Sequence, residues 1–290
     1  MKSAPSDPSD RGKVDRSDPG LPPGMSARIE RDPLQERLFS RGDLIDHAVL
    51  DFPGIRSLDM NGIDADSYLG PDVEIISSMI GTHDRELYEI RLQYEARVVE
   101  RVAPSYHIGF DGPTYKEGDM DEETRRDNIE SYLQGIHWLY ERFADEPTTI
   151  VPTMKGTTPE EYRACYNGFR GVPGIKGILD GQFAVYAGQR FGVEGGGIRQ
   201  LEDSLWAMDA TCNSNRMFIV GYGSPWRLER FPGSVKGIAG LQYWLKRTDF
   251  RNVPLYVARR RFRTLRSEVD SILGTGYHQL SFQQFGQGKS

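Results

Sequence analysis

Residues 105–115 read Ser-Tyr-His-Ile-Gly-Phe-Asp-Gly-Pro-Thr-Tyr, a short apolar segment that ends in the carboxylate of Asp111 and a Gly-Pro pair. This pattern predicts a buried strand that stops at Asp111. An amphipathic helix is expected from Asp121 to about Phe143, and another short strand at 149–156. Open α/β sheets and α/β barrels place their chemistry at the carboxyl ends of such strands. On its own, however, Asp111 is better explained as a turn residue or a helix cap.

The alternation of strand and helix continues along the chain. We expect further strands at 54–59, 177–180, 183–188 and 216–225. Further helices are expected at 33–39, 71–101, 158–169, 198–211 and 259–266, and a helix is expected to restart at Trp226. At least five strand–helix units follow one another with short links, and no dinucleotide-binding fingerprint opens the series. The sequence therefore predicts an α/β fold, a (β/α)8 TIM-type barrel that need not be regular, rather than a doubly wound sheet.

Length and composition set the limits of the interpretation. The chain has 290 residues and a formal charge of −6, so one barrel fits, and any contact with nucleic acid must use a local basic patch. Residues 1–25 are polar and rich in Pro and Gly, which predicts a disordered tail before a single domain at 26–290. Met25 is a candidate internal start.

Cysteine and histidine usage predicts neither a disulfide framework nor a thiolate-rich zinc site. The two cysteines are isolated, and the five histidines show no ligand spacing, so no metal or cofactor is expected. Cys165 lies on the apolar side of an expected helix and is interpreted as a small buried side chain. No apolar run of about 18 residues and no signal peptide is present, which predicts a soluble cytoplasmic protein without a membrane partner.

A second carboxylate is expected at a strand end. Residues 54–58 suggest a short strand that runs into Asp59-Met60-Asn61-Gly62, where Asn-Gly is a strong turn signal. Taken alone, Asp59 is also better explained as a turn residue.

In this order, the segments resemble the tRNA-guanine transglycosylase superfamily over residues 48–250, and most closely its DNA-acting branch, the DpdA-type 7-deazaguanine transglycosylases. Residues 109–115, Gly-Phe-Asp-Gly-Pro-Thr-Tyr, look like the family's Phe-Asp-Glu-Cys-Thr-Pro-Tyr. Residues 149–156 are similar to its strand ending in Val-Gln-Gly-Gly, and residues 218–225 to its Leu-Met-Gly-Val-Gly-Thr-Pro. The resemblance rests on all three motifs occurring in this order.

The resemblance implies a pentosyltransferase that exchanges guanine for a 7-deazaguanine base in a nucleotide turned out of its stack. Capturing the sugar carbon and protonating the leaving base both require carboxylates. Asp111 matches the aspartate that recognises the base, and Asp59 the aspartate that handles protons, although Leu-Asp-Met-Asn-Gly replaces the family's Leu-Asp-Ser-Gly-Gly. The base site is further expected to include Lys155, Gly188, Gln189, Gly221 and Tyr222.

The family's nucleophile has no direct counterpart. Residues 237–242, Gly-Ile-Ala-Gly-Leu-Gln, stand where the family has Gly-Ile-Asp-Met-Phe-Asp, and Gln242 cannot attack as a carboxylate does. Either Asp249 serves through a shifted alignment, or another carboxylate does, or covalent chemistry is absent. The zinc cluster and the C-terminal RNA-binding domain of the tRNA branch are also missing, which favours DNA over tRNA as the substrate. A non-catalytic barrel that binds nucleic acid or a deazapurine, a tRNA-acting enzyme and an unrelated barrel hydrolase remain as alternatives.

A basic segment near the C-terminus is the expected contact with nucleic acid. Five arginines occur within eight residues: Arg259, Arg260, Arg261, Arg263 and Arg266. Such a run is explained either by a solvated helix face or by phosphate contacts. Residues 279–285, Gln-Leu-Ser-Phe-Gln-Gln-Phe, faintly resemble a sliding-clamp-binding peptide, with a packed or frayed tail as the alternative.

Overall fold

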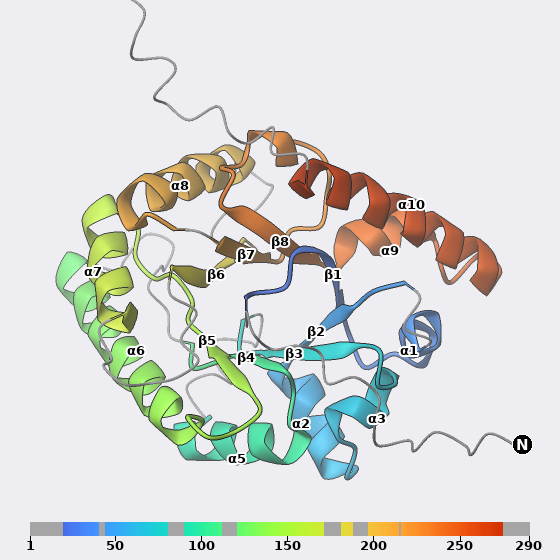
Figure 1. Cartoon of the computed structure of the whole chain (residues 1–290), viewed down its shortest axis with the longest axis horizontal. Helices are drawn as coiled ribbons and strands as arrows, with labels where there is room; N and C mark the ends of the chain where they lie inside the picture. The colour runs from blue at the N-terminus through green and yellow to red at the C-terminus, as the bar shows by residue number, and fades with distance from the viewer. Residues whose placement is uncertain are drawn as a thin grey trace, which may run out of the picture.

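The computed structural model describes residues 20–40, 44–80, 90–111, 121–170, 181–187, 197–214 and 216–274. Eight parallel strands in these ranges form one sheet in the order β5-β4-β3-β2-β1-β8-β7-β6. A bridge between Thr153 and Ala184 links the two ends of this order, so the sheet nearly closes on itself. Helices surround the strands on the outside (Figure 1). The predicted (β/α)8 TIM barrel is therefore confirmed.

The strands are β1 (Gly24–Ile29), β2 (His47–Asp51), β3 (Glu74–Ser78), β4 (Tyr106–Ile108), β5 (Thr149–Val151), β6 (Gln182–Tyr186), β7 (Arg216–Val220) and β8 (Val235–Gly240). The helices are α1 (Pro33–Phe39), α2 (Phe52–Met60), α3 (Ala65–Leu69), α5 (Leu92–Val102), α6 (Glu122–Arg142), α7 (Pro159–Arg170), α8 (Gly197–Cys212), the 3-10 turn η2 (Leu228–Arg230), α9 (Gln242–Thr248) and α10 (Leu255–Gly274). None of these described helices is both long and apolar enough to cross a lipid bilayer.

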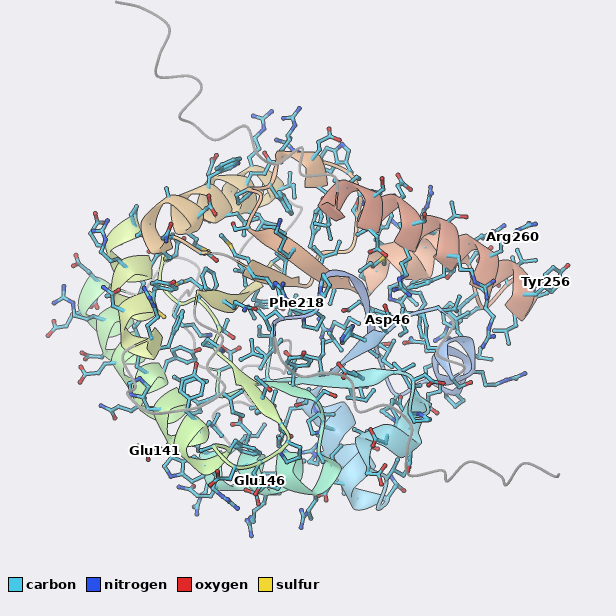
Figure 2. The ribbon with its side chains drawn as sticks, in the orientation of Figure 1. Asp46, Glu141, Glu146, Phe218, Tyr256 and Arg260 are labelled. Carbon is cyan, nitrogen blue, oxygen red and sulfur yellow. The ribbon has the colours of Figure 1, made fainter. Side chains whose placement is uncertain are left out.

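Both faces of the sheet are buried, which explains the short apolar strands. In β2, Val49 points into the barrel while Ala48 and Leu50 pack against the helical layer. Phe218 lies in the middle of the barrel (Figure 2). The buried apolar side chains of the interior are Leu21, Val49, Ile76, Ile80, Ile108, Val151, Ala184, Phe218, Val220 and Ala239.

Residues 20–25 belong to the barrel, contrary to the expected boundary at residue 26. Leu21 is 1% exposed, and β1 already begins at Gly24. The Leu21 amide donates to Gln182 Oε1 at 2.7 Å, and its carbonyl accepts from Arg216 Nη1 at 2.7 Å. The segment is thus fixed to β6 and β7, at the end of the barrel where the strands begin. Residues 1–19 of the predicted tail lie outside the described residues.

The strand predicted at 54–59 is wrong, because this segment is the helix α2. Asp51 caps the helix by accepting from the Gly54 amide at 3.0 Å, and a proline stands in its first turn. Ile55 and Leu58 are three residues apart and both buried, which is the spacing of one helix face.

The single helix predicted at 71–101 is also wrong, since the segment contains β3 and α5. The apolar run before Ser78 is only a few residues long, and at that length a buried strand and a helix have similar patterns. The helix expected to restart at Trp226 is only the 3-10 turn η2. The helices expected at 33–39, 121–143, 158–169 and 198–211 are confirmed to within one residue at each end.

Candidate active site

Polar side chains gather where the strands end. Asp51 closes β2 and Ser78 closes β3, and these two residues are register partners. Ser78 is in turn the partner of Ile108, three residues before Asp111. Because all strands are parallel, their carboxyl ends meet at one mouth of the barrel, where barrel enzymes have their active sites.

Asp111 and Lys155 form a buried ion pair at this mouth. Lys155 Nζ donates to Asp111 Oδ1, and the two side chains are 9% and 3% exposed for Asp111 and Lys155 respectively. The ammonium also lies over the ring of Tyr132, 5.2 Å from its centre. The Tyr132 hydroxyl accepts from the Thr153 amide at 2.6 Å, which fixes the ring under the pair. Burial of either charge alone would be costly, so the two side chains act as one unit.

A buried hydrogen-bonded chain lies behind Asp111. Ser77 Oγ is 2.6 Å from His107 Nδ1, and His107 Nε2 is 2.8 Å from Glu95 Oε1. Because the Glu95 carboxylate is an acceptor, His107 Nε2 donates to it, and the other ring nitrogen is hydrogen-bonded to Ser77 Oγ. The three residues are 0% exposed.

This chain supports the turn that presents Asp111. Glu95 Oε1 also accepts from the Phe110 amide at 2.7 Å. Phe110 has a φ of 31°, in the left-handed region that non-glycine residues rarely adopt. Since Ser77 has no access to solvent, the chain does not form a nucleophilic site. Instead, this hydrogen-bonded chain fixes the backbone at Phe110, one residue before Asp111.

The sequence interpretation missed Glu95 and His107. Glu95 lies on the apolar face of α5, between Leu92 and Val98. A carboxylate on the buried face of a helix needs a partner, and this signal in the sequence could have identified Glu95. Its partner could not be named from the sequence, because α5 and β4 meet only in the folded barrel.

Asp59 is not at the mouth. It is the penultimate residue of α2, which begins beside the end of β2 and runs away from the mouth. Its carboxylate accepts from Arg101 at 2.7 Å, on the neighbouring helix α5. The structure therefore places the predicted proton-handling aspartate at the opposite end of the barrel from Asp111. The carboxylate that ends a strand in this region is Asp51.

Asp249 is not placed beside Asp111 either. It ends α9 in a left-handed conformation, and its side chain is 45% exposed. Oδ1 accepts from Asn252 at 2.7 Å, and Oδ2 lies 3.9 Å from Arg261 on α10. Figure 1 shows α9 and α10 in the outer helical layer. Gln242, at the position of the family's nucleophile, opens α9 and is not buried.

Two other predicted base contacts follow β7 at the mouth. Gly221 has a φ of 96°, which favours glycine, and its amide donates to Ala239 at 2.7 Å. The Tyr222 hydroxyl donates to the Trp226 carbonyl, and burial raises the pKa of this hydroxyl well above its usual value. Tyr222 is therefore a neutral donor at ordinary pH. Gly188 and Gln189 lie outside the described residues.

The predicted arginines all lie on α10. Arg266 binds Asp46, Asp270 and the Leu44 carbonyl. Arg259 donates to the Arg37 carbonyl at 3.1 Å, and Arg261 to the Thr248 carbonyl at 3.2 Å. Arg260 and Arg263 lie on the exposed side of the helix.

Two further expectations concern metals and the C-terminus. Among the described residues, no group of His, Cys, Asp and Glu side chains is arranged to hold a metal ion. Residues 279–285, which resemble a clamp-binding peptide, are outside the described part of the chain.

Comparisons with known proteins show similarity in fold alone. No protein-family model and no curated protein matches the sequence. The tryptophan synthase alpha chain from Legionella pneumophila subsp. pneumophila is similar at 12% identity, with 86% of this chain and 92% of that chain covered and a TM-score of 0.49. The D-allulose 3-epimerase from Methylomonas sp. has 11% identity, coverage of 88% and 100%, and a TM-score of 0.46. At this level of similarity neither activity nor substrate transfers to this chain, and the resemblance to transglycosylases stays a prediction.

Proposed function

We propose that the protein is a base-exchange enzyme that replaces guanine by a 7-deazaguanine base in DNA. The observation that carries the proposal is the buried Asp111–Lys155 pair at the mouth of the barrel. It stands on the segment whose sequence resembles the base-reading motif of the transglycosylase superfamily.

The pair offers hydrogen-bonding groups that complement a guanine edge. Lys155 is an ammonium with three donor positions, and it donates to Asp111 Oδ1. A guanine or 7-deazaguanine presents its O6 acceptor beside the N1–H and amino donors. In our proposal the ammonium donates to O6 while the second oxygen of Asp111 accepts from N1–H and the amino group. Adenine has the reverse pattern of donors and acceptors at these positions, so the pair would discriminate against it.

The proposal assigns the reaction at the sugar to Asp51 in place of Asp59 and Asp249. Asp51 ends β2 at the mouth of the barrel, is half-buried, and accepts from the Gly54 amide through Oδ1. In the first step its carboxylate would bond to C1′ while the bond from C1′ to N9 breaks, and the base leaves with that electron pair and takes a proton from water, which becomes hydroxide. In the second step N9 of the incoming base would lose its proton to that hydroxide and bond to C1′, which breaks the bond from C1′ to Asp51 and releases the carboxylate.

A second candidate function is a barrel that binds the base without exchanging it. The position of Asp59 and Asp249 away from the mouth favours it, because both carboxylates predicted for catalysis are then unavailable.

One experiment separates these functions. Purified protein is incubated with radiolabelled guanine or a 7-deazaguanine and with duplex DNA or tRNA, and incorporation is compared with binding of the free base. We expect incorporation into DNA that is lost in Asp111→Asn and Asp51→Asn and kept in the control Asp59→Asn. Binding of the base without incorporation in either nucleic acid would favour the second function. Absence of both would contradict the two proposals together.

A further inference from the structure

The basic residues of this acidic protein are concentrated on α9 and α10. Residues 242–267 contain eight basic side chains and one acidic side chain, in a chain with a formal charge of −6. Several of these cations lie near acidic groups, and the pairs are Arg247 with Glu268, Arg251 with Asp32, Arg261 with Asp249, and Arg266 with Asp46 and Asp270. The charge is densest on α10, where residues 259–266 hold five arginines.

One face of α10 combines an exposed aromatic ring with exposed cations. Tyr256, Arg260 and Arg263 are spaced at i, i+4 and i+7, so they lie on one side of the helix. Tyr256 is 72% exposed. Figure 2 shows Tyr256 and Arg260 pointing into solvent near the end of α10 where the helix begins. This face is in the outer layer of the barrel, away from the Asp111–Lys155 pair.

A groove runs beside this face, between α1 and α10. It has a volume of about 460 Å³ and is lined by Arg37, Leu255, Tyr256 and Arg259. The hydrogen bond from Arg259 Nη2 to the Arg37 carbonyl ties the guanidinium to the opposite wall. The groove thus offers an aromatic ring, an aliphatic wall and two cations to a single occupant.

Single-stranded DNA matches this combination of groups. Each nucleotide carries a phosphate for the arginines and a base whose flat face stacks on an aromatic ring. In a duplex the base faces are covered by their neighbours, so Tyr256 would add nothing. An acidic peptide would pair with the arginines but has no group that requires an exposed tyrosine ring.

We propose that the α1–α10 groove and the adjoining face of α10 form a binding site for single-stranded DNA, with one base stacked on Tyr256 and the phosphates bound by Arg260 and its neighbours. The site lies outside the barrel mouth and does not depend on the base-exchange function.

Fluorescence anisotropy with a labelled thymidine oligonucleotide of about 12 nucleotides tests the proposal. Stacking contributes about 1–3 kcal/mol per base, so Tyr256→Ala is expected to weaken binding roughly 5- to 150-fold, while Tyr256→Phe binds like the wild type. Arg260→Gln is expected to weaken binding and to reduce the slope of log K against log salt by about 0.7. Arg126→Gln is the matched control, since Arg126 is a 74% exposed arginine on α6.

Circular dichroism checks that each variant is folded, which we expect because all the altered side chains are exposed. Wild-type affinity in both Tyr256→Ala and Arg260→Gln would overturn the proposal. An equal loss of affinity in Arg126→Gln would also overturn it. So would an affinity for duplex DNA that equals the affinity for single-stranded DNA and is unchanged in Tyr256→Ala. Because no base exchange is measured, these results are independent of the outcome for Asp111 and Asp51.

Discussion

Two buried charges, those of Asp111 and Lys155, organise the mouth of the barrel. Lys155 is an ammonium with 3% exposure, and the carboxylate of Asp111 compensates its charge. The geometry of the pair depends on the Phe110 amide, which Glu95 holds from behind. The position of Asp111 and the stability of this region are therefore coupled.

The first prediction concerns the ion pair. Lys155→Met and Asp111→Asn each leave one buried charge without its partner, and each is expected to lower the free energy of unfolding by about 3–5 kcal/mol. The double variant leaves no charge and should lose less than the sum of the two. Urea unfolding of the four proteins gives the coupling energy. If the two losses were additive, the side chains would not interact as the structure shows.

The second prediction concerns Glu95. Glu95→Gln keeps an oxygen that accepts from the Phe110 amide, whereas Glu95→Leu leaves this amide and His107 Nε2 without an acceptor. We expect Glu95→Leu to cost about 1–3 kcal/mol for each orphaned group and Glu95→Gln to cost less. The readouts are urea unfolding and binding of labelled guanine.

Gln35→Leu provides the matched control for Glu95. Gln35 is also buried and accepts from a backbone amide just after a strand, that of Glu30 at 2.9 Å, but this strand is β1. The variant should lose stability without loss of base binding. Equal effects of Gln35→Leu and Glu95→Leu on base binding would show that Glu95 does not act through Asp111.

Among the helices and strands, the long amphipathic helices were predicted well from the sequence and the short segments poorly. Helix α6 was predicted because its apolar period extends over 21 residues, and Asp121 marks its start. In contrast, α2 has only nine residues, and its apolar positions also fit a strand. This ambiguity assigned the strand-end carboxylate to Asp59 when it is Asp51.

The candidate site shows the same limit. Asp111 and Lys155 could be placed together from the sequence, because both follow parallel strands that are neighbours in the barrel. The support from Glu95 could not be predicted from the sequence, since it depends on how α5 packs on β4. Asp249 lies away from the candidate site for a related reason. Helix α9 leads the chain outward after β8, and no sequence signal fixes the direction of so short a helix.

The third prediction uses the double role of Asp51, as the cap of α2 and as the proposed catalytic group. Asparagine caps helices about as well as aspartate, so Asp51→Asn should leave stability nearly unchanged, whereas Asp51→Ala should cost about 0.5–2 kcal/mol. Both variants should lose base exchange. Thermal unfolding and incorporation of labelled base are measured together. An Asp51→Asn variant that keeps full incorporation would remove Asp51 from the reaction.

The barrel as a whole depends on a segment whose composition does not reveal its importance. Gly20, Leu21 and Pro22 are buried, although they belong to a stretch that is rich in glycine and proline. Tyr106 donates to the Gly20 carbonyl at 3.1 Å, so β4 joins β6 and β7 in holding the segment. The barrel interior is thereby covered at the end opposite the candidate site.

The last prediction compares a chain that begins at Gly20, behind an added initiator methionine, with a chain that begins at Met25, the candidate internal start. The shorter chain lacks Leu21, whose burial contributes about 1.5–3 kcal/mol. It also lacks the backbone groups that Gln182 and Arg216 bind, at a cost of about 1–3 kcal/mol for each side chain that stays buried.

We therefore expect the chain from Gly20 to unfold cooperatively in urea, and the chain from Met25 to unfold at a much lower urea concentration or to fail to fold. Leu21→Ala in the longer chain isolates the apolar part of the loss, because it keeps the backbone groups that Gln182 and Arg216 bind. Equal stability of the two chains would mean that the barrel closes without residues 20–24, and Met25 would then be a workable start for a folded protein.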